Sequence, residues 1–256
     1  MNREQGTIRQ LPEIKDQDAN ELFARLVSNE AWTPQDQIRI TEAFCLAAKL
    51  HIDDTHRAKP YVYHVLRVAN RLASPDHLDR PDADLVIAAL LHDCVEDHAE
   101  RLIELLPRDV QLSEPLGRIP LQQTVGHQAV ALIYIARGFG QNVASLVGIV
   151  TNPPDMYRGL TGAAKTDRYA EKVAEVIVHH DAWFLKFADF IDNAVGIIHS
   201  VGEDPVKIEY RKAKYLPVIA ILEARFYEPD IQAMLSPAAR QYAYNKLNRA
   251  KVVLAA

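Results

Sequence analysis

Residues 88–97, with the sequence AALLHDCVED, place side chains that can bind a metal or transfer a proton at the end of an apolar segment. Such groups are costly to bury without partners. In a continuous helix, His92 would stand beside Glu96, four residues later, and Asp93 would stand beside Asp97. A divalent cation would balance the buried carboxylates, and mixed imidazole and carboxylate ligands suit manganese, iron, zinc and other first-row metals.

Two other segments carry polar residues among apolar neighbours. In LKFADFIDN, residues 185–193, Asp189 and Asn193 lie one helical turn apart, and a buried aspartate again favours a cation. His64 lies between the core-type residues Val62 and Leu66. A single histidine on an apolar helix is more often a hydrogen-bonded core residue than a ligand, and Asp189 and Asn193 could be ordinary exposed residues.

Glu96 and Asp97 also have an ordinary interpretation, as solvated residues at the end of a helix. Negative charge at a helix C-terminus opposes the helix dipole, which favours the metal interpretation. We expect the other histidines in loops or at helix ends, most of them at the surface: His51, His56, His77, His98, His127, His179, His180 and His199.

The composition fits one globular domain of 256 residues with 48% hydrophobic content. Its formal net charge of -5 provides no basic surplus, so nucleic-acid binding is not expected and an anionic substrate would need locally placed cations. Cys45 and Cys94 both lie in apolar helical patterns, which favours a reducing, cytoplasmic location over a disulfide framework. The polar start lacks the apolar core of a secretory signal, and no apolar run is long enough to span a bilayer. Both features argue against export and membrane insertion.

Apolar residues recur at helical spacing nearly everywhere, which predicts an all-α fold. We expect a short helix in an N-terminal extension at 1–30, a core at 31–200, and C-terminal helices at 201–256 packed on the same domain. Thr33, Pro34 and Asp36 predict the capped start of a helix whose core stripe includes Ile38, Ala43, Phe44, Ala47 and Leu50. The other expected helices are 18–27, 61–72, 82–96, 127–137, 140–150, 163–179, 182–198 and one opened by Ser236 and Pro237.

Breaks between these helices are predicted from polar, glycine-rich and proline-rich segments. We expect a loop at 52–60 and an irregular insertion or lid with one short helix at 99–126. Pro205 and Pro217 are expected to mark further breaks.

Together, the motifs resemble the hydrolase domain of the RelA/SpoT alarmone family and its small single-domain relatives. Four blocks occur in the family's order over residues 40–200: PYVYH at 60–64, AALLHDCVED at 88–97, the helical segment leading to Val150 and Thr151, and Lys-x-Ala-Asp-x-x-x-Asn at 186–193. The resemblance implies an HD-domain helical bundle.

The resemblance also implies a mechanism. His64, His92, Asp93 and Asp189 would hold one metal, usually manganese in this family, while Glu96 and Asp97 would handle the attacking water. Asn193 would contact the nucleotide sugar. The family removes the 3'-pyrophosphate from guanosine tetra- or pentaphosphate, and the residues present suit that chemistry.

The sequence departs from the family where substrate would bind. Thr55 and His56 stand in place of a basic pair, with Arg57 and Lys59 displaced into the same loop. Phe190 replaces a basic residue and Asp192 a histidine or tyrosine. Lys165 and Arg168 are candidate phosphate contacts, although such helical pairs are usually only solvated.

Two alternatives remain beside an alarmone hydrolase. The chain could be an HD phosphohydrolase that acts on another nucleotide. It could instead be a nucleotide-binding protein that neutralises a toxic alarmone synthetase, although the intact Glu96 and Asp97 argue against pure binding. The expected partner is a small nucleotide, and the sequence does not specify an oligomeric state.

Overall fold

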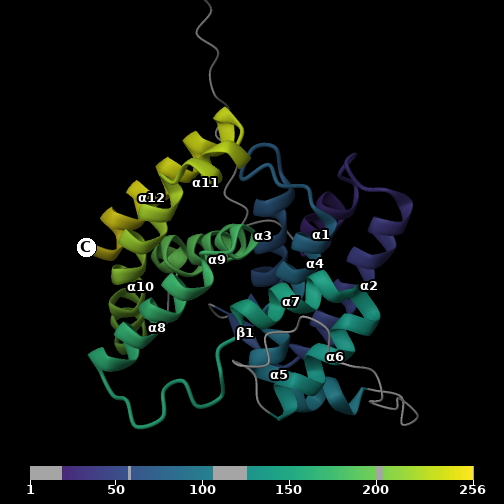
Figure 1. Cartoon of the computed structure of the whole chain (residues 1–256), viewed down its shortest axis with the longest axis horizontal. Coiled ribbons are helices and arrows are strands. Elements are labelled where there is room, and N and C mark those ends of the chain that lie inside the picture. The colour runs from purple at the N-terminus through teal and green to yellow at the C-terminus, as the bar shows by residue number, and fades with distance from the viewer. Residues whose placement is uncertain (1–18, 57–58, 106–125, 200–203, 256) are drawn as a thin grey trace, which may run out of the picture.

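The computed structural model describes residues 19–56, 59–105, 126–199 and 204–255, and these residues form an all-α bundle (Figure 1). The all-α prediction is confirmed. The helices are α1 (Ala19–Val27), α2 (Pro34–Leu50), α3 (Val62–Ala73), α4 (Ala83–Leu91), α5 (Cys94–Glu104), α6 (His127–Phe139), α7 (Gln141–Val150), α8 (Ala163–Val176), α9 (His180–Asn193), the 3-10 helix η2 (Val195–His199), α10 (Pro205–Phe226), α11 (Pro229–Met234) and α12 (Pro237–Ala255).

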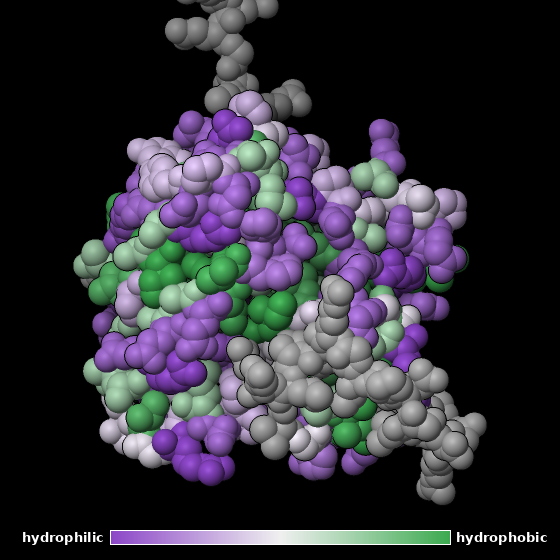
Figure 2. Space-filling view, viewed as in Figure 1, coloured by the Kyte–Doolittle hydropathy of each residue, from purple (hydrophilic) through white to green (hydrophobic). Residues whose placement is uncertain are grey.

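Helix α9 crosses the middle of the molecule, with α3 and α4 beside it and α10 and α12 at one side (Figure 1). Large aromatic side chains account for the central position of α9. Trp183, Phe184 and Phe187 are fully buried, and Trp183 and Phe187 stack with ring centroids 5.0 Å apart. One apolar core runs from Leu22 in α1 to Leu254 in α12. Figure 2 shows apolar residues gathered in the middle of the same face, with polar residues around them.

The predicted start of α2 is present. The Thr33 hydroxyl accepts a hydrogen bond from the backbone N–H of Asp36, and the Asp36 carboxylate accepts one from the backbone N–H of Thr33, with Pro34 in the first turn. These bonds satisfy N–H groups that have no partner within the helix. The side chains of Asp82 and Asp204 cap α4 and α10 in a similar way.

The single helix predicted at 82–96 is wrong, because α4 ends at Leu91 and α5 begins at Cys94. The Nδ1–H of His92 donates to the carbonyl oxygen of Ala89 at 2.8 Å. In a continuous helix that carbonyl would accept from the backbone N–H of Asp93, so the imidazole competes with the helical ladder at this step. The two ligand candidates His92 and Asp93 therefore lie in a turn between two helices.

Other sequence expectations also need correction. The loop expected at 52–60 contains two short antiparallel strands, β1 (Thr55–His56) and β2 (Lys59–Pro60). Pro217 lies inside α10 rather than at a break, and α10 packs against both α8 and α12. Helix α5 extends to Glu104, into the expected insertion, and residues 106–125 of that insertion lie outside the described residues.

Burial shows two further differences. Ile38 is 52% exposed, and the core position in that turn of α2 is taken by the fully buried Ile40. His51 and His77, expected at the surface, are buried.

Within the described residues, no helix is both long and apolar enough to span a bilayer.

The capping box of α2 gives a stability prediction. Thr33→Ala removes the acceptor for the Asp36 N–H, so we expect it to lower the free energy of unfolding by about 1 kcal/mol in urea titrations. Thr41→Ala, in the same helix, is the matched control and should change it by less than about 0.5 kcal/mol. Equal effects of the two substitutions would contradict the capping role.

Candidate metal centre

Four predicted ligands from three parts of the fold meet at one point. His64 comes from α3, His92 and Asp93 from the turn between α4 and α5, and Asp189 from α9. The Nε2 atom of His64 lies 3.4 Å from Asp189 Oδ1 and 3.7 Å from Asp93 Oδ2. The Nε2 atom of His92 lies 2.9 Å from Asp93 Oδ2 and 3.7 Å from Asp189 Oδ1.

The ring of His92 turns a lone pair toward the two carboxylates. Its Nδ1 carries the proton, because the Ala89 carbonyl can only accept a hydrogen bond. Its Nε2 is buried and has no hydrogen-bond partner within the part of the chain that the structure describes. An unpartnered buried nitrogen beside two carboxylates is the arrangement that a bound cation would satisfy.

His64 is oriented in the same way by a carboxylate that sequence reasoning treated only as a departure from the family. Its Nδ1 donates to Asp192 Oδ2 at 2.8 Å, so its Nε2 faces Asp93 and Asp189. Asp192 also accepts from Arg67 at 2.7 and 2.8 Å, and Arg71 Nη1 lies 2.8 Å from it. Asp192 therefore fixes the orientation of the His64 ring, as a carboxylate commonly does for a histidine that binds a metal.

The two arginines were missed from the sequence, although a signal was present. Arg67 and Arg71 follow His64 by three and seven residues, so all three share one face of α3. Charged residues on the buried face of an apolar helix require a partner of opposite charge. That partner is Asp192, 1% exposed, whose pKa is held well below its usual range: burial opposes the shift, but the arginines and His64 outweigh it.

The electrostatics of the four predicted ligands favour positive charge at their centre. Burial disfavours a charged His64 ring, but the carboxylates of Asp189, Asp192 and Asp93 outweigh burial and raise the pKa of His64 to about 9. The carboxylates of Asp93 and Asp189 likewise outweigh burial and raise the pKa of His92. Protons on the rings can supply this charge, and so can a divalent cation bound to the ring nitrogens and carboxylates. The residues therefore fit a first-row divalent cation.

Further residues hold the ligands and the neighbouring acids in place. The Tyr61 hydroxyl donates to Asp93, and the Asn193 amide donates to Asp189. Glu96 accepts from Asn152 twice, from the backbone N–H at 3.0 Å and from the side-chain amide at 2.8 Å. Asn152, in the turn after α7, was missed because its distance from Glu96 in the sequence gives no indication of contact.

Asp97 lies in the first turn of α5, close to this acidic group. Although the residue is exposed, partial desolvation of its carboxylate, and then the nearby carboxylates of Asp93 and Glu96, raise the pKa of Asp97 to about 7. A carboxyl group with such a pKa can exchange a proton near neutral pH.

The predicted phosphate contacts lie in different surroundings. Arg57 lies outside the described residues, and the Lys59 Nζ is 5.4 Å from the centre of the Tyr63 ring. Arg168 forms ion pairs with Glu171 and Glu175 at 3.3 and 3.0 Å. Lys165 is half-buried in the first turn of α8.

Other lysines face the acidic residues from the inside of the bundle. Burial raises the pKa of Asp189, but His64 and His92 outweigh burial, and the charge of Lys186, 7% exposed, adds to the lowering of that pKa. Lys214 in α10 lies with its Nζ 4.1 Å from the centre of the Tyr169 ring, and its charge interacts with those of Glu96 and Asp189. Sequence reasoning missed Lys214 because it lies outside the four motif blocks.

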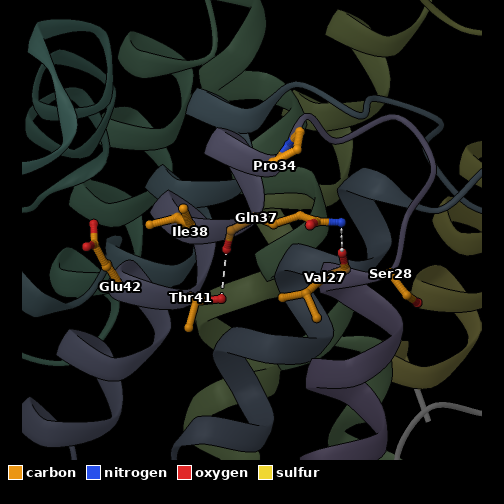
Figure 3. Close-up of a pocket in the computed structure, with 7 residues that line it drawn as sticks. All are labelled: Val27, Ser28, Pro34, Gln37, Ile38, Thr41 and Glu42. Carbon is orange, nitrogen blue, oxygen red and sulfur yellow. Dashed lines mark hydrogen bonds between the residues drawn. The ribbon is translucent and has the colours of Figure 1, made fainter.

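A hollow of about 680 Å³ elsewhere on the surface is not part of this site. It lies between α1 and α2, and none of its lining residues is a candidate ligand or catalytic acid (Figure 3). Ile38 and Val27 supply apolar surface there, and the side-chain amide of Gln37 donates to the Val27 carbonyl. Its lining has no buried charge or convergent polar groups that would indicate an anionic ligand.

No protein-family model matches the chain, and no curated protein matches it. The geometry of these residues and the motif resemblance are therefore what indicate a function.

The Asp192 network gives a stability prediction. Asp192→Asn leaves Arg67 and Arg71 without their buried counter-charge, so we expect the free energy of unfolding to fall by about 3–5 kcal/mol in urea titrations. Asp230→Asn is the matched control, since Asp230 pairs with Arg225 at the surface, and it should have a much smaller effect. An Asp192→Asn variant as stable as the wild type would contradict the inferred network.

Cation binding can be tested without an activity assay. Mn²⁺ at roughly 100 times its dissociation constant should stabilise the fold by about 2.7 kcal/mol and raise the Tm by about 5–10 °C. Asp189→Asn preserves the shape of the side chain but removes its charge, so the rise in Tm should be smaller. Differential scanning fluorimetry with matched metal-free samples measures both. An equal rise in the variant would count against Asp189 as a ligand.

Proposed function

We propose that the chain is a manganese-dependent phosphohydrolase that removes the 3'-pyrophosphate from guanosine tetra- or pentaphosphate. The observation that carries the proposal is the convergence of two imidazole nitrogens and two carboxylates, with Glu96 and Asp97 in the next helical turn. The four motif blocks that resemble the RelA/SpoT hydrolase domain support this substrate class.

In this proposal, His64, His92, Asp93 and Asp189 hold the cation. When bound, it would make a nearby water molecule more acidic and neutralise phosphate charge. Asp97 accepts the proton of the attacking water, which its pKa of about 7 allows near neutral pH. Glu96 orients that water, and its two hydrogen bonds to Asn152 fix the carboxylate in one position.

An anionic substrate needs cations that the acidic ligands do not neutralise. Lys186 and Lys214 supply positive charge beside Asp189 and Glu96, so we assign them to the phosphate groups of the substrate together with the loop residues Arg57 and Lys59. Tyr169 and Tyr215, whose rings lie 4.1 and 5.2 Å from the Lys214 Nζ, restrict the position of that lysine. Arg168 is a weaker candidate because two glutamates already surround it.

The departures from the family bear on specificity. Phe190, in place of a basic residue, is buried with its ring centre 6.0 Å from that of Tyr215, so it contributes to the core and supplies no charge. The substrate must therefore obtain its counter-charge from other elements, which is why a panel of nucleotides belongs in the test. Hydrolysis of another nucleotide would retain the metal chemistry and change the substrate.

The test is hydrolysis of guanosine tetraphosphate with added Mn²⁺, with release of pyrophosphate and GDP measured by chromatography. We expect the wild type to release both products and Asp93→Ala to release neither. Glu96→Gln should lower kcat by about 10²- to 10⁴-fold, because it removes the charge that orients water. Glu42→Gln, an exposed glutamate on α2, is the matched control and should leave kcat unchanged.

Two outcomes would redirect the proposal. If folded, metal-loaded protein released no product from guanosine tetraphosphate but hydrolysed another nucleotide of the panel, the substrate assignment would be wrong. If Glu96→Gln abolished turnover but the variant still protected cells from a toxic alarmone synthetase, binding rather than hydrolysis would explain the protection.

A further inference from the structure

A second group of ligand-type side chains lies outside the four proposed ligands. His51 Nδ1 is 2.7 Å from Asp54 Oδ2, and His98 Nε2 is 2.6 Å from the same oxygen. The two ring nitrogens lie 3.1 Å apart. Three potential ligand atoms, two nitrogens and one oxygen, therefore surround a single point.

Local structure fixes each of the three residues. His51 is the C-cap of α2, and its backbone N–H donates to the Ala47 carbonyl. Asp54 follows in a turn closed by its N–H to the His51 carbonyl, and its own carbonyl accepts from Tyr61 N–H. The two residues thus lie in one short connection between α2 and α3.

His98 reaches the same point from α5. Its backbone leaves the helical region, with φ -133° and ψ 27°, in the middle of that helix. One turn later, Arg101 donates to the Leu50 carbonyl at 3.0 Å, which joins α5 to the end of α2. The His98 ring is thereby held against Asp54.

The surroundings of His51 suit a ligating imidazole. Its Nε2 lies 3.7 Å from the Cys94 sulfur, which can accept the Nε2–H and so leave a lone pair on Nδ1. The Tyr61 ring stacks on the His51 ring at 4.4 Å and fixes its plane. The side chains of Asp54 and His98 are 35% and 18% exposed, so an ion can enter from solvent.

The spacing of the three atoms also suits a cation. With bonds of about 2.1 Å, neighbouring ligand atoms lie about 3.0 Å apart around an octahedral ion and about 3.4 Å apart around a tetrahedral one. The observed separations of 2.6, 2.7 and 3.1 Å reach the octahedral value with shifts of a few tenths of an ångström. A set of two imidazoles and one carboxylate is a common first-row metal site with open positions.

We propose that His51, Asp54 and His98 form a second site for one first-row divalent cation, separate from the site built on His92 and Asp93. Tyr61 lies between the two, since it stacks on His51 and donates to Asp93. The proposal does not depend on the substrate or on hydrolysis. It predicts that the chain holds two cations, of which the second has solvent-facing coordination positions.

The test uses Co²⁺ as the probe, added to the full metal-free chain by equilibrium dialysis, with cobalt per chain measured by elemental analysis. We expect two cobalt ions in the wild type and one in His98→Ala. The isosteric Asp54→Asn variant should also bind one, which keeps the test valid if His98→Ala fails to fold. Asp93→Ala should retain one ion, and the double variant Asp93→Ala, His98→Ala should bind none.

His180→Ala is the matched control, because His180 pairs with a single aspartate, Asp230, at the surface, and it should retain two ions. If folded Asp54→Asn and His98→Ala bind as much cobalt as the wild type, the second site is overturned. It is also overturned if the wild type binds one ion and Asp93→Ala binds none. One ion that survives Asp93→Ala and disappears in His98→Ala would support this site and count against the first.

Discussion

Buried negative charge is the constraint on which this structure depends. Asp93, Asp189 and Asp192 approach one another inside an apolar bundle, where unpaired carboxylates are costly. Arg67 and Arg71 neutralise Asp192. The remaining two carboxylates face the ring nitrogens of His64 and His92, and the proposed cation would complete that charge balance.

The apolar core keeps these groups in register. Trp183 and Phe187 anchor α9 through stacking, and the Trp183 indole donates to the Leu222 carbonyl of α10. Asp189 and Asp192 lie further along the same rigid helix and so meet α3 at fixed positions. Because interior packing transmits small displacements, the precision of the polar site depends on these aromatic contacts.

The turn at His92 and Asp93 has two consequences. It ends α4 and lets the ring of His92 and the carboxylate of Asp93 face one centre, and it starts α5 in a direction that brings His98 to the end of α2. The same turn therefore contributes to both groups of candidate ligands. Tyr61 contacts each of them, so a change at either group is expected to reach the other through this ring.

The sequence by itself determined the all-α class and the capped start of α2, which depend on local spacing and capping chemistry. Its motif resemblance singled out His64, His92, Asp93 and Asp189 as candidate ligands, and the structure brings these four side chains together. Only the tertiary structure decided that Asp192 holds His64, that Asn152 holds Glu96, and that His51 and His98 share Asp54. Apart from the local pair of His51 and Asp54, these partners lie 44 to 128 residues apart along the chain, and no local pattern specifies contacts that arise only when helices pack.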